Sequence, residues 1–164
     1  EKQATGTYYA ARREAARTRL AMTDFDRAID GFQALSREQK GTAGGKMAHF
    51  ELGLAHFLAN NPEEARKTWR ALAKTVPKNT PIGVMVRVGL GDVPPHRIEH
   101  KLSQQGGVVR AVVYYLAAVQ AEDRAQAKAF AERARQEAGA HLPWLFHYLE
   151  THDIVTSGNQ EMSP

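Results

Sequence analysis

Several features on which many proteins depend are missing from this 164-residue chain. It contains no cysteine, which excludes a disulfide framework, a cysteine-ligated zinc or iron–sulfur site and a catalytic thiol. No apolar run approaches the roughly 18 residues that span a membrane, so we expect no transmembrane segment. No dinucleotide fingerprint, phosphate-binding loop or nucleophile elbow is present. We therefore expect no cofactor, no bound metal and no enzymatic activity.

The excess of basic residues is small. The chain has 22 Lys and Arg against 18 Asp and Glu, a net charge of +4. Basic residues cluster near the amino terminus, at Arg12, Arg13, Arg17 and Arg19, and acidic residues follow at Asp24, Asp26 and Asp30. A dedicated nucleic-acid binder usually carries a denser basic stripe. We therefore expect a solvated helix face at this cluster, with RNA binding as the alternative.

The clearest predicted element is a helical hairpin over residues 46–77. Its first helix carries apolar residues at steps of three and four, the spacing of one helix face, at Met47, Phe50, Leu54 and Phe57. A second apolar side comes from Leu52, Ala55 and Ala59, so this helix must pack on two sides. Asn61 and Pro62 are typical of a helix start, and Pro77 ends the second helix. We expect neighbouring hairpins, because one hairpin cannot bury both sides alone.

The alternation of helix, turn and helix extends in both directions and predicts an all-α fold in one domain over residues 1–155. The predicted hairpins cover residues 7–37, 46–77, 80–105 (degenerate) and 108–138, followed by a terminal helix over 143–152 and a polar tail over 156–164. Residues 82–90 also alternate with a period of two, which is typical of a strand. We expect helix there, because two isolated strands would be marginally stable.

The hairpin over 46–77 resembles a tetratricopeptide repeat, a helix–turn–helix unit of about 34 residues. The matching leucine, glycine, alanine, aromatic and proline positions are Leu52, Gly53, Ala65, Trp69 and Pro77. Gly53 and Ala65 have a physical reason to be small, since the paired helices cross closely there. The resemblance covers about two thirds of the chain and implies a right-handed superhelix (α-solenoid) whose concave groove binds a segment of another protein.

Carried onto this chain, the resemblance implies that the groove is lined by Arg13, Arg17, Phe50, Leu54, Phe57, Leu58, Val84, Val88, Val112 and Leu116. These positions are mostly apolar, which favours a peptide or an amphipathic helix as the partner. The alternative is that the apolar residues form the core. The aromatic segment 143–149 either caps the last hairpin or folds back into the groove.

Two short motifs have an alternative chemical interpretation. His96, Glu99 and His100 form an H-x-x-E-H pattern, which in some peptidases holds zinc; a solvated helix with polar pairing is the expectation here. The glycine-rich segment 41–46 joins helix to helix, whereas a phosphate-binding loop follows a strand. We expect a flexible loop.

The sequence thus predicts a non-catalytic scaffold or adaptor that binds another protein in its groove. The alternatives are an RNA-binding helical repeat protein and the accessory repeat region of a larger bacterial envelope or assembly enzyme. The last is motivated by Glu1 standing where a methionine would start the chain. The partner, the compartment and the oligomeric state are not predicted.

Overall fold

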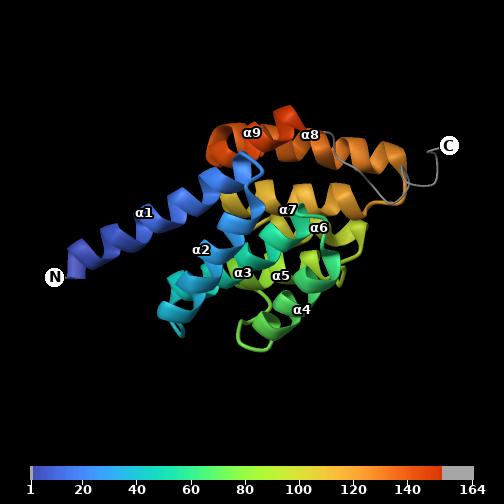
Figure 1. Ribbon diagram of the computed structural model, residues 1–164. Helices are drawn as coiled ribbons and strands as arrows, with labels where there is room; N and C mark the ends of the chain where they lie inside the picture. Colours follow the sequence, from blue (N-terminus) through green and yellow to red (C-terminus); the bar gives the residue numbers. More distant parts are fainter. Residues whose placement is uncertain (1, 153–164) are drawn as a thin grey trace. The chain divides into compact units, whose positions relative to one another are not determined.

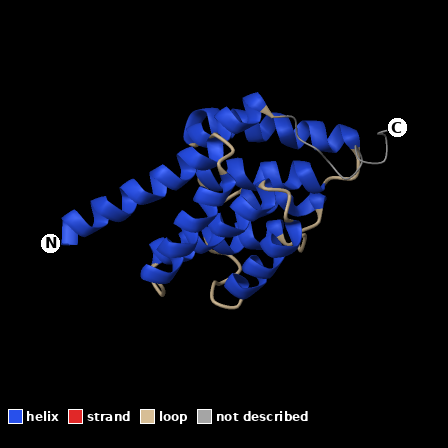
Figure 2. Cartoon of the chain, viewed as in Figure 1, coloured by secondary structure: helices blue, strands red, loops and turns tan. Residues whose placement is uncertain are grey.

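The computed structural model describes residues 2–152, with side chains from Gly6 onward, and this part of the chain consists of helices joined by loops and turns (Figures 1 and 2). It forms nine α-helices and one 3-10 turn, which confirms the all-α fold class. No strand occurs in it, and residues 82–90 fall in helix α5 (Pro81–Gly89) and the residue after it. None of the helices between residues 2 and 152 is both long enough and apolar enough to cross a membrane. The predicted tail, 156–164, lies outside the described residues.

The chain divides into two compact units, Glu1–Thr75 and Val76–Pro164. The boundary falls at the end of the second predicted hairpin, within the single domain expected over residues 1–155. Each unit has its own apolar core and is described by itself.

Unit 1 contains four helices, α1 (Lys2–Ala21), α2 (Phe25–Glu38), α3 (Ala43–Leu58) and α4 (Pro62–Ala73). Helix α3 packs against both α2 and α4, as its two apolar sides predict. The turn between α3 and α4 has Asn60 in the left-handed conformation, with φ of 63°. Asn61 and Pro62 then start α4 at the predicted place, although the Asn61 side chain makes no capping hydrogen bond.

The close approach of α3 and α4 depends on Gly53 and Trp69. The Trp69 indole is fully buried, stacks on Phe50 with 5.6 Å between ring centroids, and donates its N–H to the Phe50 carbonyl at 3.1 Å. A Cβ atom placed on Gly53 would lie 2.2 Å from the Trp69 Nε1 atom. Gly53 is therefore small because the indole occupies the space beside it, which confirms the physical reason given for this residue.

The glycine-rich segment 41–46 is mostly helix, which corrects the expected flexible loop. Helix α3 begins at Ala43, and the Thr42 hydroxyl caps it by accepting the Gly45 N–H at 3.0 Å. A Cβ atom on Gly45 would lie 2.0 Å from the Gln39 carbonyl oxygen. The glycine therefore permits a close backbone contact at the start of a helix, a role that composition alone does not distinguish from a loop.

Unit 2 contains α5, the 3-10 turn η1 (Pro95–Arg97), α6 (Ile98–Leu102), α7 (Gly107–Gln120), α8 (Arg124–His141) and α9 (Pro143–Thr151). Helix α7 is the centre of this unit: it packs against α5, α6 and α8, and residues 111–118 are all buried. Helix α9 packs against α8 and buries Leu145 and Leu149. The aromatic segment 143–149 thus covers the last hairpin, which is the first of its two expected arrangements.

Candidate functional site

A small cavity in unit 2 lies beside helix α5 and the turn that follows it. The Thr80 hydroxyl starts α5 by accepting the Gly83 N–H at 3.1 Å. The helix ends before Gly91, whose φ of 77° is the left-handed conformation that glycine adopts at no steric cost. The chain then turns through residues 92–94 into η1 and α6, so two short helical segments and their connections surround the cavity.

The turn η1 and helix α6 each place one cation beside the cavity, Arg97 and Lys101. Ile98 and Leu102 are buried, with 2% and 0% of their surfaces exposed, and they lie four residues apart on one face. Arg97 and Lys101 precede them and have the same spacing, so they share a neighbouring face. The burial of the two apolar residues therefore fixes the side on which the two cations lie.

The cavity has a volume of about 160 Å³ and is lined by Lys78, Val84, Arg87, Asp92, Val93, Pro94, Arg97 and Lys101. We call these eight residues the basic pocket. Three of them are apolar, four are cationic and one is acidic. Pockets for drug-sized ligands occupy about 300 to 1,000 Å³. The basic pocket is therefore sized for one chemical group of a ligand rather than for a whole cofactor.

The charges of the basic pocket are unbalanced. Four cations face one carboxylate, that of Asp92, so the formal net charge is +3. Within residues 2–152, no carboxylate lies at ion-pair distance from Lys78, Arg97 or Lys101. Like charges gathered around one cavity repel each other and attract anions. The pocket is thus an electrostatically prepared site for an anionic group.

The fourth cation, Arg87, is the most firmly positioned. It is half-buried on α5, three residues after the buried Val84, and its guanidinium donates to the Val76 carbonyl at 3.4 Å. A guanidinium tied to the backbone on one side keeps its remaining N–H groups in a fixed plane. Arg87 therefore contributes a preoriented charge, whereas the exposed Lys78 and Arg97 adapt to what binds.

A second polar cluster in unit 2 explains the H-x-x-E-H pattern. The Tyr114 hydroxyl donates to Glu99 Oε2 at 2.8 Å, and the Arg133 guanidinium donates to the Tyr114 oxygen at 2.9 Å. Arg133 also lies over the Tyr114 ring, 5.1 Å from its centroid. Burial, and then the Glu99 carboxylate, raise the pKa of Tyr114, so the phenol keeps its proton and donates it.

Glu99 is therefore engaged in a structural cluster between α6, α7 and α8. His96 lies in η1 and His100 in α6, so the pattern does not fall on one regular helix. The described residues contain no group of three His, Asp or Glu side chains that could hold a metal ion.

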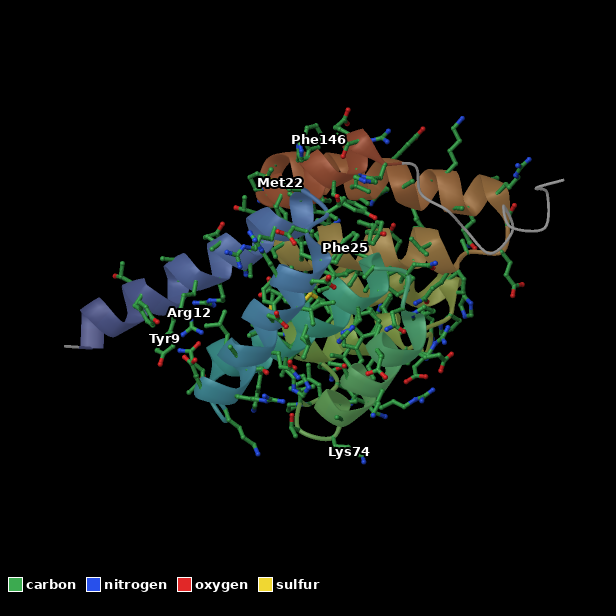
Figure 3. The ribbon with its side chains drawn as sticks, in the orientation of Figure 1. Tyr9, Arg12, Met22, Phe25, Lys74 and Phe146 are labelled. Carbon is green, nitrogen blue, oxygen red and sulfur yellow. The ribbon has the colours of Figure 1, made fainter. Side chains whose placement is uncertain are left out.

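The amino-terminal arginines are largely engaged within unit 1. Arg12 forms a two-pronged ion pair with Glu38, one prong of which measures 3.1 Å, and its guanidinium lies over the rings of Tyr8 and Tyr9. Figure 3 shows Tyr9 and Arg12 together on α1. These contacts engage Arg12, one of the four arginines that the RNA-binding alternative would use for phosphate contacts.

Arg17 holds a buried carboxylate. Its Nε and Nη2 atoms donate to Glu51 at 2.7 and 3.1 Å, and its Nη1 atom donates to Glu14 at 2.8 Å. Glu51 is only 2% exposed. Burial raises the pKa of the Glu51 carboxyl, and the hydrogen bonds from Arg17 oppose that rise without cancelling it. Burial lowers the pKa of Arg17, but the hydrogen bonds to Glu51 and Glu14 and the charges of these two carboxylates together outweigh burial and leave the pKa above its usual value.

The apolar residues expected to line a groove lie mostly in the interior. Seven of them are buried: Phe50, Leu54, Leu58, Val84, Val88, Val112 and Leu116. Phe57 is half-buried, 6.0 Å from the Trp69 ring, and Arg13 and Arg17 are also half-buried. Their burial favours the alternative interpretation, that these apolar residues form the core, and their role in binding a partner stays a prediction. Val84 alone among the ten predicted positions lines the basic pocket.

The basic pocket was not among the sites that sequence reasoning identified. Its cations are spread over 24 positions, from a loop through two helices, and no motif joins them. One signal was present: residues 78–101 contain four cations and two carboxylates, a larger local excess than in the chain as a whole. That excess shows that the segment is basic, but it does not show that the four side chains line one cavity. Their coming together depends on the turn between α5 and α6.

Comparisons of the chain with protein-family models, with curated proteins and with solved structures find no match. The tetratricopeptide resemblance therefore stays a prediction. Function is therefore inferred from the geometry of each unit.

Proposed function

We propose that this chain is a non-catalytic binding module built from antiparallel helical hairpins, and that it binds an acidic segment of another protein at the basic pocket. The observation that carries the proposal is the pocket's net charge of +3, with three cations that have no carboxylate partner within residues 2–152. A partner's carboxylates would supply the missing charge. The stacked, superhelical arrangement of hairpins belongs to this proposal and is supported by the α3–α4 pair with its Gly53–Trp69 contact.

The pocket also favours a polypeptide over a free ion. Val93 and Pro94 supply apolar surface next to the cations, and such surface suits the carbon atoms of a side chain that carries the acidic group. Asp92 is an acceptor for a donor such as a backbone N–H of the same segment. A bound segment would thus satisfy charge, apolar and hydrogen-bonding groups together.

The proposal is tested by fluorescence anisotropy with a labelled peptide of alternating Glu and Ala residues and a matched peptide of Gln and Ala. The Glu peptide should bind, and Lys101→Glu should weaken its binding about tenfold or more, since charge-assisted hydrogen bonds contribute about 1.5 to 3 kcal/mol. The matched control is Lys128→Glu, a cation on α8 that is exposed and outside the pocket.

Equal binding of the Glu and Gln peptides, or equal effects of the two substitutions, would contradict the proposal. Tight binding of a single-stranded RNA oligomer, with a steep loss of affinity as salt rises and no binding of the Glu peptide, would favour the RNA alternative instead.

A further inference from the structure

We infer that the basic pocket recognises a phosphate monoester, carried on a phosphorylated side chain of the partner segment. This inference rests on the proposed function and specifies the group that occupies the pocket. Its first support is charge. A phosphorylated side chain carries about −1.5 to −2 at pH 7, whereas a carboxylate carries −1. A pocket with a formal charge of +3 is better neutralised by the phosphate.

The second support is that the cations come from three segments of the chain. Lys78 belongs to the connection before α5, Arg87 to α5 itself, and Arg97 and Lys101 to η1 and α6. Residues of the connection before α5, of α5 and of the η1–α6 segment thus line one cavity. A phosphate presents three terminal oxygens in a tetrahedral arrangement, whereas a carboxylate presents two oxygens in one plane. The tetrahedral group can accept from all three segments at once.

The third support is the mixture of guanidinium and ammonium groups. Arg97 offers a planar fork that binds two phosphate oxygens, Lys78 and Lys101 act as compact point charges, and Arg87 adds a positive charge in the cavity lining. The cavity of about 160 Å³ admits a single group of this kind. Val93 and Pro94 then contact the carbon atoms that attach the phosphate to the partner.

The remaining carboxylate sets a limit on the ligand. Asp92 would repel a second phosphate or a neighbouring acidic side chain in the same cavity. We therefore expect one phosphorylated residue in the pocket, flanked by neutral residues. A continuous polyanion such as RNA presents repeated phosphates and meets this repulsion.

The test uses the full chain and three labelled peptides that differ at one central position, which is phosphoserine, glutamate or serine. Anisotropy titrations at constant ionic strength should give an affinity for the phosphoserine peptide at least about tenfold above that for the glutamate peptide, because the dianion forms more charge-assisted hydrogen bonds. Inorganic phosphate should displace the phosphoserine peptide at concentrations at which acetate does not.

Two variants locate the effect. Arg97→Ser and Lys101→Glu should each remove the preference for phosphoserine over glutamate, and Lys128→Glu should keep it. If Arg97→Ser or Lys101→Glu perturbs folding, competition by inorganic phosphate against the unmodified chain still tests the inference.

The outcomes separate the two proposals. Equal affinity for the phosphoserine and glutamate peptides, both above that for serine, overturns the phosphate inference and leaves the acidic-segment proposal standing. No binding of either acidic peptide overturns both. Binding to vesicles that contain phosphatidic acid, without binding to the phosphoserine peptide, overturns the assignment to a protein partner.

Discussion

Arg12 and Arg17 of unit 1 differ from the cations of the basic pocket in unit 2 in how their charges are paired, although unit 2 also has ion pairs between helices, at Arg110, Arg133 and Arg135. In unit 1, Arg12 and Arg17 meet carboxylates across helices, at Glu38 and at Glu51. In unit 2, the four cations of the basic pocket converge on a cavity with one carboxylate. Both units have a buried helix at their centre, α3 or α7, so the difference does not come from the hairpin architecture. Paired charge holds helices together, whereas unpaired charge around a cavity is available for a ligand.

The largest effect should come from removing a paired charge in unit 1. Arg17→Met would leave Glu51 buried without its cation, and breaking a buried ion pair from one side costs about 3 to 5 kcal/mol. Urea unfolding measures the free energy directly. The matched control is Arg27→Met, which breaks an exposed pair with Asp24 at 3.7 Å and should cost at most about 1 kcal/mol. If the two variants lose similar free energies of unfolding, burial does not determine how much an ion pair contributes to stability.

A smaller change in stability should follow from replacing a tightly packed glycine in unit 1, and a matched glycine in unit 2 should tolerate the same replacement. Gly53→Ala would force a methyl group into the Trp69 indole and should destabilise the protein by about 1 to 3 kcal/mol. In unit 2, a Cβ atom on Gly139 would meet Phe146 at 3.4 Å, an ordinary contact. Gly139→Ala should therefore be neutral or stabilising by about 0.5 to 1 kcal/mol, because alanine is the better helix former. Thermal unfolding that ranks the two variants in the reverse order would refute this contrast.

The smallest effect concerns the paired charges of unit 2. Tyr114→Phe would remove the hydroxyl between Glu99 and Arg133 and should cost about 0.5 to 1.5 kcal/mol, the net contribution of a hydrogen bond. Binding of acidic peptides at the basic pocket should not change. A variant that unfolds at the same urea concentration as the unmodified chain would show that the cluster has no structural role.

The sequence predicts the helices well because their apolar residues recur at helical spacing and their ends carry Pro or capping residues. Thr80 and Asp123, residue types that favour the position before a helix, cap their helices by accepting from Gly83 and Ala125. The start of α3 was misplaced, because Gly45 is used for a close contact with Gln39 and not for flexibility. The same sequence pattern serves both purposes.

The candidate site could not be predicted in the same way. Periodicity shows that Phe50, Val88 and Leu116 lie on apolar faces, but it does not show whether such a face meets a partner or the protein's own core. All three are buried here. The pocket depends on how Gly91 turns the chain and on which face of α6 the buried Ile98 selects. Both features depend on the tertiary structure, so the spacing of residues within one helix does not predict them.

The most direct test of the account is the free energy of unfolding of the Arg97→Ser/Lys101→Ser double variant, measured in urea in a buffer without phosphate or other multivalent anions. If the pocket cations serve a ligand and not the fold, their loss relieves repulsion. The variant should then be as stable as the unmodified chain to within about 0.5 kcal/mol, or more stable. A loss on the order of 2 kcal/mol or more would contradict the account, since it would place these cations among the structural charges, as in unit 1.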